Sequence, residues 1–359
     1  MPDELEQRKS EHLDLALHGD VEPLESDALW HCVRLVHRAL PELRLGDIDV
    51  STSLCGVRLK APLMIVGMTG GTDRAGRINR DLALLAEEEG VAFGVGSMRV
   101  VLRDPARFAS FDVRPSRPPL LFANLSAQQL VETPDAPQRL IAMLGADGIC
   151  IHLNPAQELV QAEGDRDFRG GLDAIGALAR ELPGKLIVKE TGCGIGPAVA
   201  RQLASRGVRA IDISGSGGTS WTRVEQLRAT TPEARALGEL LSGWGIPSAA
   251  ALAACARAVG AAAGAGEVEL IASGGVRSGL DVAKAIALGA SVAGFALPML
   301  KAHQRGGVEA ARAELRGCVT ALKAICLLTG SRDLAGLRAS RPVLLEPLQS
   351  WVAQLRDDP

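Results

Sequence analysis

Short apolar runs rich in β-branched residues recur along the chain, and most are followed by a stretch with the apolar period of a helix. Each run ends in small or polar residues. We find about eight such runs, at residues 63–67, 91–95, 120–124, 148–152, 186–189, 210–213, 269–272 and 291–295. About eight parallel strands that alternate with helices predict a closed (β/α)8 TIM barrel, which is an α/β fold.

The domain organisation follows from the same spacing. A doubly wound sheet with a second domain is the alternative, but no Pro/Ser-rich linker or shift in composition divides the 359 residues. We therefore expect one domain over 1–359, with an amphipathic N-terminal extension (1–60), a barrel (61–301) and closing helices (302–359). The long connection after the sixth run contains Trp221 and Trp244 and is a candidate lid.

Composition narrows the possible functions. The formal charge is −3 with both signs interspersed, and aromatic residues make up 3% with no Tyr, which argues against nucleic-acid binding. The seven cysteines form no CxxC pair and are expected to be reduced core residues. The charged first residues lack the apolar segment of a signal peptide, and the Ala-rich run at 248–266 is interrupted by Arg257. We expect a cytoplasmic protein without a nucleic-acid or membrane partner.

The last two runs end in segments that suit a phosphate group. The seventh is followed by Ser273-Gly-Gly-Val-Arg-Ser-Gly-Leu-Asp281, and the eighth ends in Gly294-Phe-Ala-Leu-Pro298. Glycines allow backbone N–H groups to approach a phosphate, and in barrels the loops after the last two strands often form phosphate sites. A tight turn is the alternative for the glycine pair. The predicted phosphate-site residues are Gly274, Gly275, Arg277, Ala296 and Leu297.

The other runs also deliver hydrogen-bonding groups to the same rim. These candidates are Met68, Thr69, Gly70, Ser97, Asn124, Lys189, Ser214 and Thr219. They suit a large flat polar ligand with a phosphate tail, and flavin mononucleotide (FMN) fits best, with Lys189 stabilising negative charge on the N1 side of the ring. Pairing of Lys189 with Glu190 remains an alternative, as does a simple turn role for Thr69 and Ser214.

The fourth run stops abruptly at a dense polar cluster. Its residues are His152, Asn154, Gln157 and Glu158. So many polar groups past the end of a buried strand indicate a site, because the rim is where α/β enzymes carry out their chemistry.

Several motifs, in order, resemble those of the type 2 isopentenyl-diphosphate isomerases. They are Arg8-Lys9-x-x-His12, Val36-His-Arg-Ala-Leu-Pro-Glu42, the segment from Ala61-Pro to Met68-Thr-Gly-Gly71, Gly96-Ser-Met-Arg99, His152-Leu-Asn-Pro-Ala-Gln-Glu158, Lys189-Glu-Thr-Gly-Cys-Gly194, Gly217-Gly-Thr-Ser-Trp221, Trp244-Gly-Ile-Pro247 and Ser273-Gly-Gly-Val-Arg277. The last loop is shared with several FMN barrels. The resemblance covers nearly the whole chain.

This resemblance implies an FMN-dependent enzyme of isoprenoid biosynthesis that interconverts isopentenyl and dimethylallyl diphosphate. It further implies Mg²⁺, flavin kept reduced by NADPH without net redox change, and a homo-oligomer, either a tetramer or an octamer. Gln157 and Lys189 would be catalytic, and Glu158 would bind the metal. The implied substrate-binding residues are Arg8, Lys9, Ser97, Met98, Arg99, His152, Asn154 and Gln157.

Other FMN-barrel chemistries remain alternatives. A small-hydroxy-acid oxidase or dehydrogenase needs a catalytic His and a carboxylate-binding Arg late in the barrel, yet no His lies between His152 and His303. An enzyme resembling inosine-monophosphate dehydrogenase needs a Cys in the loop after the sixth strand, and residues 214–221 contain none. A flavin-storage protein would not require Glu158 beside Gln157.

Overall fold

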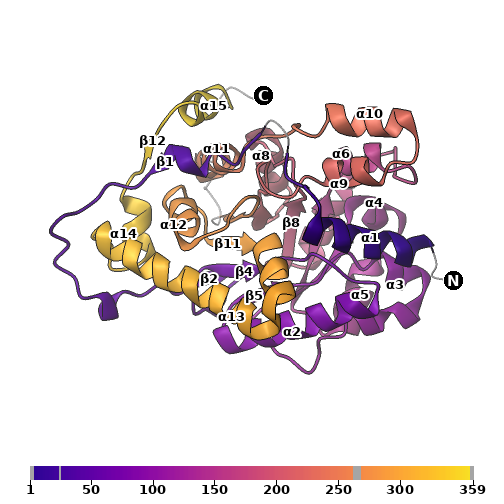
Figure 1. Ribbon diagram of the computed structural model, residues 1–359, viewed down its shortest axis with the longest axis horizontal. Helices are drawn as coiled ribbons and strands as arrows, with labels where there is room; N and C mark the ends of the chain where they lie inside the picture. Colours follow the sequence, from indigo (N-terminus) through magenta and orange to yellow (C-terminus); the bar gives the residue numbers. More distant parts are fainter. Residues whose placement is uncertain (1–3, 24–25, 262–267, 356–359) are drawn as a thin grey trace.

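The computed structural model describes residues 4–23, 26–261 and 268–355. Eight parallel strands close into a barrel, and they follow one another around it in chain order (Figure 1). They are β4 (Leu63–Ile65), β5 (Ala92–Gly94), β6 (Leu121–Ser126), β7 (Gly148–Leu153), β8 (Leu186–Glu190), β9 (Ala210–Asp212), β10 (Glu269–Ala272) and β11 (Val292–Phe295). Each predicted run overlaps one of them, so the predicted barrel is confirmed.

Helices connect the strands on the outside of the barrel. They are α2 (Asp73–Glu89), α3 (Arg99–Arg103), η3 (Pro105–Ser110), α4 (Ala127–Glu132), α5 (Ala136–Leu144), α6 (Pro155–Val160), α7 (Gly171–Glu181), α8 (Pro197–Ser205), α9 (Trp221–Arg228), α10 (Pro232–Leu240), α11 (Ser248–Ala261) and α12 (Gly279–Ala287). The connection suggested as a lid contains α9, α10 and α11, and its residues 262–267 lie outside the described residues.

The segments before and after the barrel meet each other. The extension contains α1 (Glu4–His18), η1 (Trp30–Cys32), β1 (Val33–Arg34), η2 (Leu45–Asp47), β2 (Thr52–Leu54) and β3 (Val57–Leu59). The C-terminal part contains α13 (Leu297–Leu328), α14 (Leu334–Ala339), β12 (Val343–Leu344) and α15 (Leu348–Gln354). Strand β1 pairs with β12 in antiparallel fashion, so both ends of the chain share one small sheet. The helix α13 begins at Leu297, before the expected start of the closing helices at 302.

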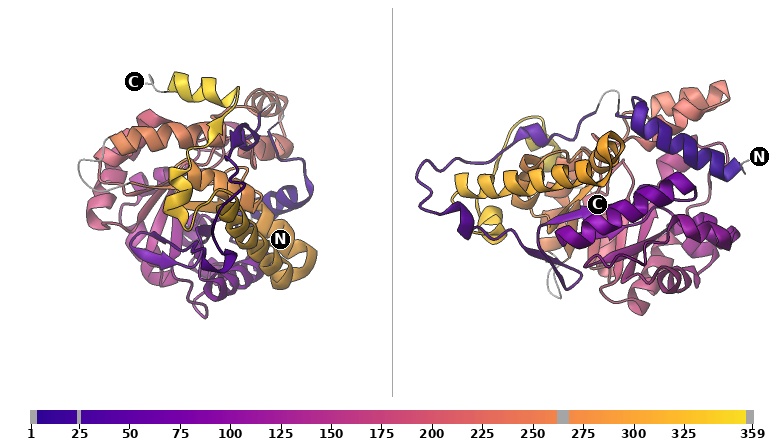
Figure 2. Two further views of the ribbon diagram at one scale, coloured as in Figure 1. Left: turned by 90° about the vertical axis from the view of Figure 1, so that its left-hand side faces the viewer. Right: turned by 60° about the horizontal axis from the view of Figure 1, so that its bottom comes forward.

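The extension spans the length of the barrel. Helix α1 packs against α9 and α13 at one end, and the chain then runs along the side of the molecule toward α14 before it returns as β2 and β3 (Figures 1 and 2). Leu54 and Leu59 of this hairpin join the apolar cluster inside the barrel. No helix within the described ranges combines the length and apolar character needed to cross a membrane.

The alternation of side chains along the strands explains where the site lies. Cys150 and Ile187 belong to the apolar cluster inside the barrel. Because successive side chains point to opposite faces of a strand, the residues two positions later, His152 and Lys189, point into the same interior. They are register partners on β7 and β8, and Lys189 is likewise the partner of Asp212 on β9. The interior of the barrel therefore changes from apolar to polar at the carboxyl ends of its strands.

Candidate active site

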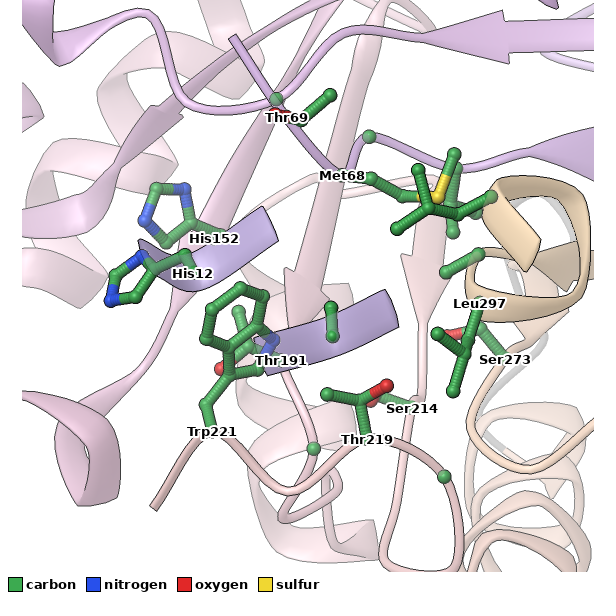
Figure 3. A pocket seen from close by; sticks show the side chains of 18 of the residues that line it. His12, Met68, Thr69, His152, Thr191, Ser214, Thr219, Trp221, Ser273 and Leu297 are labelled. Carbon is green, nitrogen blue, oxygen red and sulfur yellow. The ribbon is translucent and has the colours of Figure 1, made fainter. Parts of the chain in front are cut away.

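A cavity of about 440 Å³ opens at the carboxyl ends of the strands. This volume lies within the range of roughly 300–1,000 Å³ typical of small-molecule sites. Figure 3 shows His12 and His152 on one side of the cavity, Met68, Ser273 and Leu297 on the other, and Trp221 between them. Parts of the chain that are distant in sequence, including α1, thus surround a single site.

Most of the predicted site residues line this cavity. They are Arg8, Lys9, Met68, Thr69, Ser97, Arg99, Asn124, His152, Asn154, Gln157, Glu158, Lys189, Ser214, Thr219, Gly274, Gly275, Arg277, Ala296 and Leu297. The structure does not bring Met98 or Gly70 to the cavity wall. The Met98 side chain is fully buried in the hydrophobic core. A Cβ at Gly70 would lie 1.9 Å from the ring of Phe111, so this glycine makes room for an aromatic side chain.

One side of the cavity, which we call the glycine end, consists of the segments 273–277 and 294–298. Gly274 and Gly275 have φ angles of 83° and 68°, a left-handed conformation that glycine adopts without steric cost. A Cβ at Gly275 would lie 2.6 Å from the carbonyl oxygen of Gly217, so the loop also packs too closely for a side chain. The start of α13 adds the N-terminus of a helix, which favours negative charge.

His152 lies across the cavity from Ser273 and Leu297 (Figure 3), and the charges of Lys9 and Arg99 act on it. We call this side, with Arg8, Lys9, Arg99 and His152, the cation end. Burial and the positive charges of Arg8 and Arg99 lower the pKa of Lys9 from 10.5 to about 8. Carboxylates neutralise part of this charge, because Arg8 pairs with Glu163 at 2.9 Å. The charges of Arg8 and Arg99 still add to the effect of burial on Lys9, and an anionic ligand would relieve their repulsion.

Lys189 lines the cavity from the carboxyl end of β8. Its Nζ donates to the carbonyl oxygen of Glu190 at 2.8 Å, and its side chain is buried. The Glu190 carboxylate accepts backbone N–H bonds from Gly192 at 2.6 Å and Gly194 at 2.7 Å, which hold the loop after β8 in place. Glu190 thus binds this loop through its side chain rather than forming the ion pair with Lys189 considered as an alternative.

His152 is neutral in this environment. Burial and then the charges of Lys189 and Lys9 lower the pKa of His152 from 6.5 to about 3. Its Nδ1 lies 2.8 Å from Oδ1 of Asn124, which fixes the orientation of the ring. A histidine that stays unprotonated at neutral pH can offer a hydrogen bond but is a poor source of a proton.

Asn154, Gln157 and Glu158 form one hydrogen-bonded group at the start of α6. Asn154 Nδ2 donates to Glu158 Oε1 at 2.9 Å and to Gln157 Oε1 at 3.2 Å. The other Glu158 oxygen accepts from the backbone N–H of Asp165 at 2.7 Å. A carboxylate has about four lone-pair positions, so Glu158 retains acceptor capacity after these two bonds.

Glu225 is a functional candidate that the sequence analysis missed. This buried α9 carboxylate accepts from Gln157 Nε2 at 2.9 Å, lies 2.9 Å from His12 Nε2 and pairs with Arg228 at 2.6 Å. Burial alone would raise its pKa, but the hydrogen bond and charge of His12, the bond from Gln157 and the charge of Arg228 lower the pKa to about 2. Glu225 is therefore a permanent anion that fixes the amide of Gln157.

Gln129 is a second candidate without a sequence signal. It lines the cavity from α4 and is 4% exposed, yet its Nε2 has no hydrogen-bond partner. A buried donor without a partner costs free energy unless a ligand satisfies it. Trp221 also lines the cavity and packs edge-on against His12 with ring centroids 5.2 Å apart, whereas Trp244 is 65% exposed and does not.

Ion pairs from several barrel loops hold α1 over the cavity. Arg74 pairs with Asp14 at 2.6 Å, and Arg228 pairs with Glu11 at 2.9 Å. A further pair at 2.6 Å joins Arg107 to Glu6. The helix that carries Arg8 and Lys9 is thus positioned by residues from the connections after β4, β5 and β9.

The residues present fit FMN and Mg²⁺. The glycine end offers an uncrowded backbone to a phosphate, and Lys189 and Gln129 supply donors for the edge of a flavin ring. Over residues 4–23, 26–261 and 268–355, no three His, Cys, Asp or Glu side chains cluster to hold a metal ion. A single carboxylate such as Glu158 is enough for Mg²⁺, because proteins often bind this ion through about one or two carboxylates together with phosphate oxygens of the substrate.

Comparisons with known structures and families identify the class of this barrel. A family model described as FMN-dependent dehydrogenase matches residues 119–343. The chain is similar in fold to a mandelate oxidase (TM-score 0.63, 17% identity, 95% of this chain and 98% of the other). It is also similar to flavocytochrome b2 (TM-score 0.69, 16% identity, 94% and 84%). The protein is therefore a barrel of the FMN-dependent class.

Curated relatives define the family more closely. A protein of Synechococcus sp. named isopentenyl-diphosphate delta-isomerase is 48% identical, with 96% of this chain and 97% of the relative covered. A protein of the same name from Stutzerimonas stutzeri is 44% identical, with 93% of this chain and 96% of the relative covered. Another from Pyrococcus horikoshii is 40% identical, with 98% of this chain and 95% of the relative covered. The chain belongs to the isopentenyl-diphosphate delta-isomerase family and is an isomerase, as its motifs predicted.

Proposed function

We propose that the protein interconverts isopentenyl and dimethylallyl diphosphate, with reduced FMN as cofactor and Mg²⁺ on the diphosphate. The observation that carries this proposal is one cavity with two separate anion-binding ends. The glycine end suits the phosphate of FMN, and the cation end suits a second, more highly charged anion. The names of the relatives support a diphosphate as this second anion.

The cation end can bind a diphosphate in two complementary ways. Arg8, Lys9 and Arg99 supply direct positive charge, and Arg offers a planar fork that matches phosphate oxygens. Glu158 would hold Mg²⁺ against the same oxygens, because this ion usually keeps waters and substrate phosphates among its ligands. His152 and Asn154 would add neutral hydrogen bonds between these charged groups.

The isomerisation requires a proton to be added to one alkene carbon and another to be removed from the allylic carbon. When bound, reduced FMN supplies a ring nitrogen that can carry such a proton. Lys189 would hold positive charge at the N1 side of the ring, and Gln157, oriented by Glu225, would position the hydrocarbon part of the substrate. The low pKa of His152, about 3, makes this residue unsuitable as the acid at neutral pH.

Several finer features belong to the same proposal. NADPH would keep the flavin reduced without being consumed in proportion to product, and the activity would serve isoprenoid biosynthesis. The protein would work in the cytoplasm as a homo-oligomer, either a tetramer or an octamer.

The test is an isomerisation assay with purified protein, FMN and Mg²⁺. We expect turnover only after NADPH or dithionite has reduced the flavin, and loss of turnover when EDTA removes Mg²⁺. Equal turnover with oxidised flavin, or one NADPH consumed per product, would instead support an oxidoreductase. The substitution Gln157→Ala should lower kcat far more than it changes the Mg²⁺ requirement, because its role lies at the hydrocarbon part of the substrate.

A further inference from the structure

Trp30, in the N-terminal extension, lies directly behind the glycine end. Its indole Nε1–H donates to the carbonyl oxygen of Gly274 at 3.2 Å, and its own carbonyl oxygen accepts from Lys284 Nζ at 2.8 Å. Both side chains are buried, at 5% and 7% exposure. Lys284 belongs to α12, the helix that follows the glycine loop, so Trp30 joins the loop to this helix.

The residues around Trp30 fill the space behind the loop. A Cβ at Gly275 would lie 2.7 Å from the Cβ of Ala28, and one at Gly217 would lie 1.9 Å from the backbone nitrogen of Ala28. The carbonyl oxygen of Ala28 accepts from the backbone N–H of Ala249 at 2.9 Å. The extension is therefore wedged between the loops after β9 and β10 and is anchored to α11.

The geometry of the peptide bond gives the Trp30 contact a specific effect. The carbonyl of Gly274 and the N–H of Gly275 belong to one planar trans peptide unit, so they point in opposite directions. A hydrogen bond that draws the Gly274 oxygen toward Trp30 therefore turns the Gly275 N–H away from the extension. A Cβ at Gly218, a residue of the cavity wall, would lie 2.6 Å from this nitrogen, so the missing side chain leaves it uncovered.

Two consecutive glycines have little conformational preference of their own. We propose that Trp30 is a positioning residue for the cofactor phosphate: it fixes the Gly274–Gly275 peptide so that the Gly275 N–H faces the cavity. This inference rests on the proposed FMN site and extends it to the same N-terminal segment that carries Arg8 and Lys9. The flavin ring itself gains nothing from this contact, so the effect should be selective for the phosphate.

The experiment compares FMN with riboflavin, which has the same ring but no phosphate. Binding to the full chain, freed of flavin, is measured by quenching of flavin fluorescence for the wild type, Trp30→Phe and Trp244→Phe. Phe keeps an apolar ring but lacks the N–H donor, so the Kd for FMN should rise roughly three- to tenfold, as expected for one lost hydrogen bond. The Kd for riboflavin should not change, and the exposed Trp244 variant should match the wild type for both flavins.

A second variant tests the same brace from its other side. Lys284→Met removes the bond to the Trp30 carbonyl and should also weaken FMN selectively. An unchanged Kd for FMN in Trp30→Phe overturns the inference. An equal rise in the Kd values for FMN and riboflavin also overturns it, because it indicates a general packing defect. A wild-type chain that binds neither flavin overturns the proposed function and this inference together.

Discussion

At the glycine end of the cavity, the fold supplies backbone N–H groups and the first turn of α13 to attract an anion, and the Arg277 guanidinium is already paired with Glu22 at 2.7 Å. At the cation end, the attraction comes from the side chains of Arg8, Lys9 and Arg99, which α1 and the start of α3 bring together. The first end uses dipoles that belong to the fold, and the second uses charges that repel one another.

This difference has energetic consequences. The glycine loop is braced from behind by Trp30 and Ala28, so its geometry exists before a ligand arrives. At the cation end, burial and then the charges of Arg8 and Arg99 lower the pKa of Lys9 to about 8, and α1 is held by ion pairs as well as by the buried Leu13 and Ala16. Ligand binding at the cation end should therefore depend on salt and pH, whereas binding at the glycine end should depend on shape.

The largest expected effect separates the two ends by removing a charge. Lys9→Met should reduce kcat/KM roughly 30- to 1,000-fold, a loss of about 2–4 kcal/mol in transition-state stabilisation, because a partly buried charge contact to the proposed diphosphate is lost. The Kd for FMN should not change. Arg169→Met, whose side chain is 91% exposed, is the matched control and should have wild-type kinetics. A weaker affinity for FMN in Lys9→Met would show that the two ends are not independent.

A change of shape should have the opposite selectivity. In Gly275→Ala the new Cβ meets the Gly217 carbonyl oxygen at 2.6 Å, and the φ of 68° is strained for alanine. Strain of about 1–3 kcal/mol should raise the Kd for FMN roughly 5- to 150-fold. Gly317→Ala, where no atom lies within 4 Å of the new Cβ, is the control. With FMN at saturation, an increased substrate KM in Gly275→Ala would contradict the division between the ends.

The proposed metal ligand, Glu158, should affect only the anion bound at the cation end. Glu158→Gln keeps the shape of the side chain but removes its charge, so the Mg²⁺ concentration needed for half-maximal activity should rise by about tenfold or more. FMN should remain bound, because Glu158 lies on α6 and contacts Asn154 and the Asp165 backbone. Titration of activity with Mg²⁺ at fixed FMN measures the change, and an unaltered titration would remove Glu158 from the metal site.

The barrel and the glycine end could be predicted because their signals are local. Each strand contains a short apolar run, and the Ser273–Arg277 loop follows its strand directly. The pairing of β1 with β12 could not be predicted, since each strand has two residues and no periodic pattern. Likewise, the placement of Arg8 and Lys9 in the cavity depends on how α1 docks, so the sequence indicated it only through a family resemblance.

The direction of single side chains was also beyond the sequence pattern. Ser97 and Arg99 line the cavity, but Met98 between them points into the core. Glu225 lies in a charged helical segment, and the sequence pattern of such a segment predicts exposure to solvent. The packing of α9 against α6 and α1 instead buries Glu225 beside Gln157 and His12. Such roles depend on contacts between residues far apart in the chain, which no local pattern specifies.

The smallest expected effect is a pH dependence that only the cation end should show. Because the pKa of Lys9 is lowered to about 8, the lysine loses its proton as the pH rises through this value, and an anionic substrate needs the protonated form. The profile of kcat/KM, which reports the free enzyme, should fall to about half its plateau near pH 8. In Lys9→Arg the guanidinium stays charged, so this fall should be absent, although the plateau itself can be lower.

The FMN Kd, measured at the same ionic strength, should stay constant over this pH range in both proteins. A wild-type profile that is flat through pH 8, or an identical fall in Lys9→Arg, would show that Lys9 does not set the charge of the cation end.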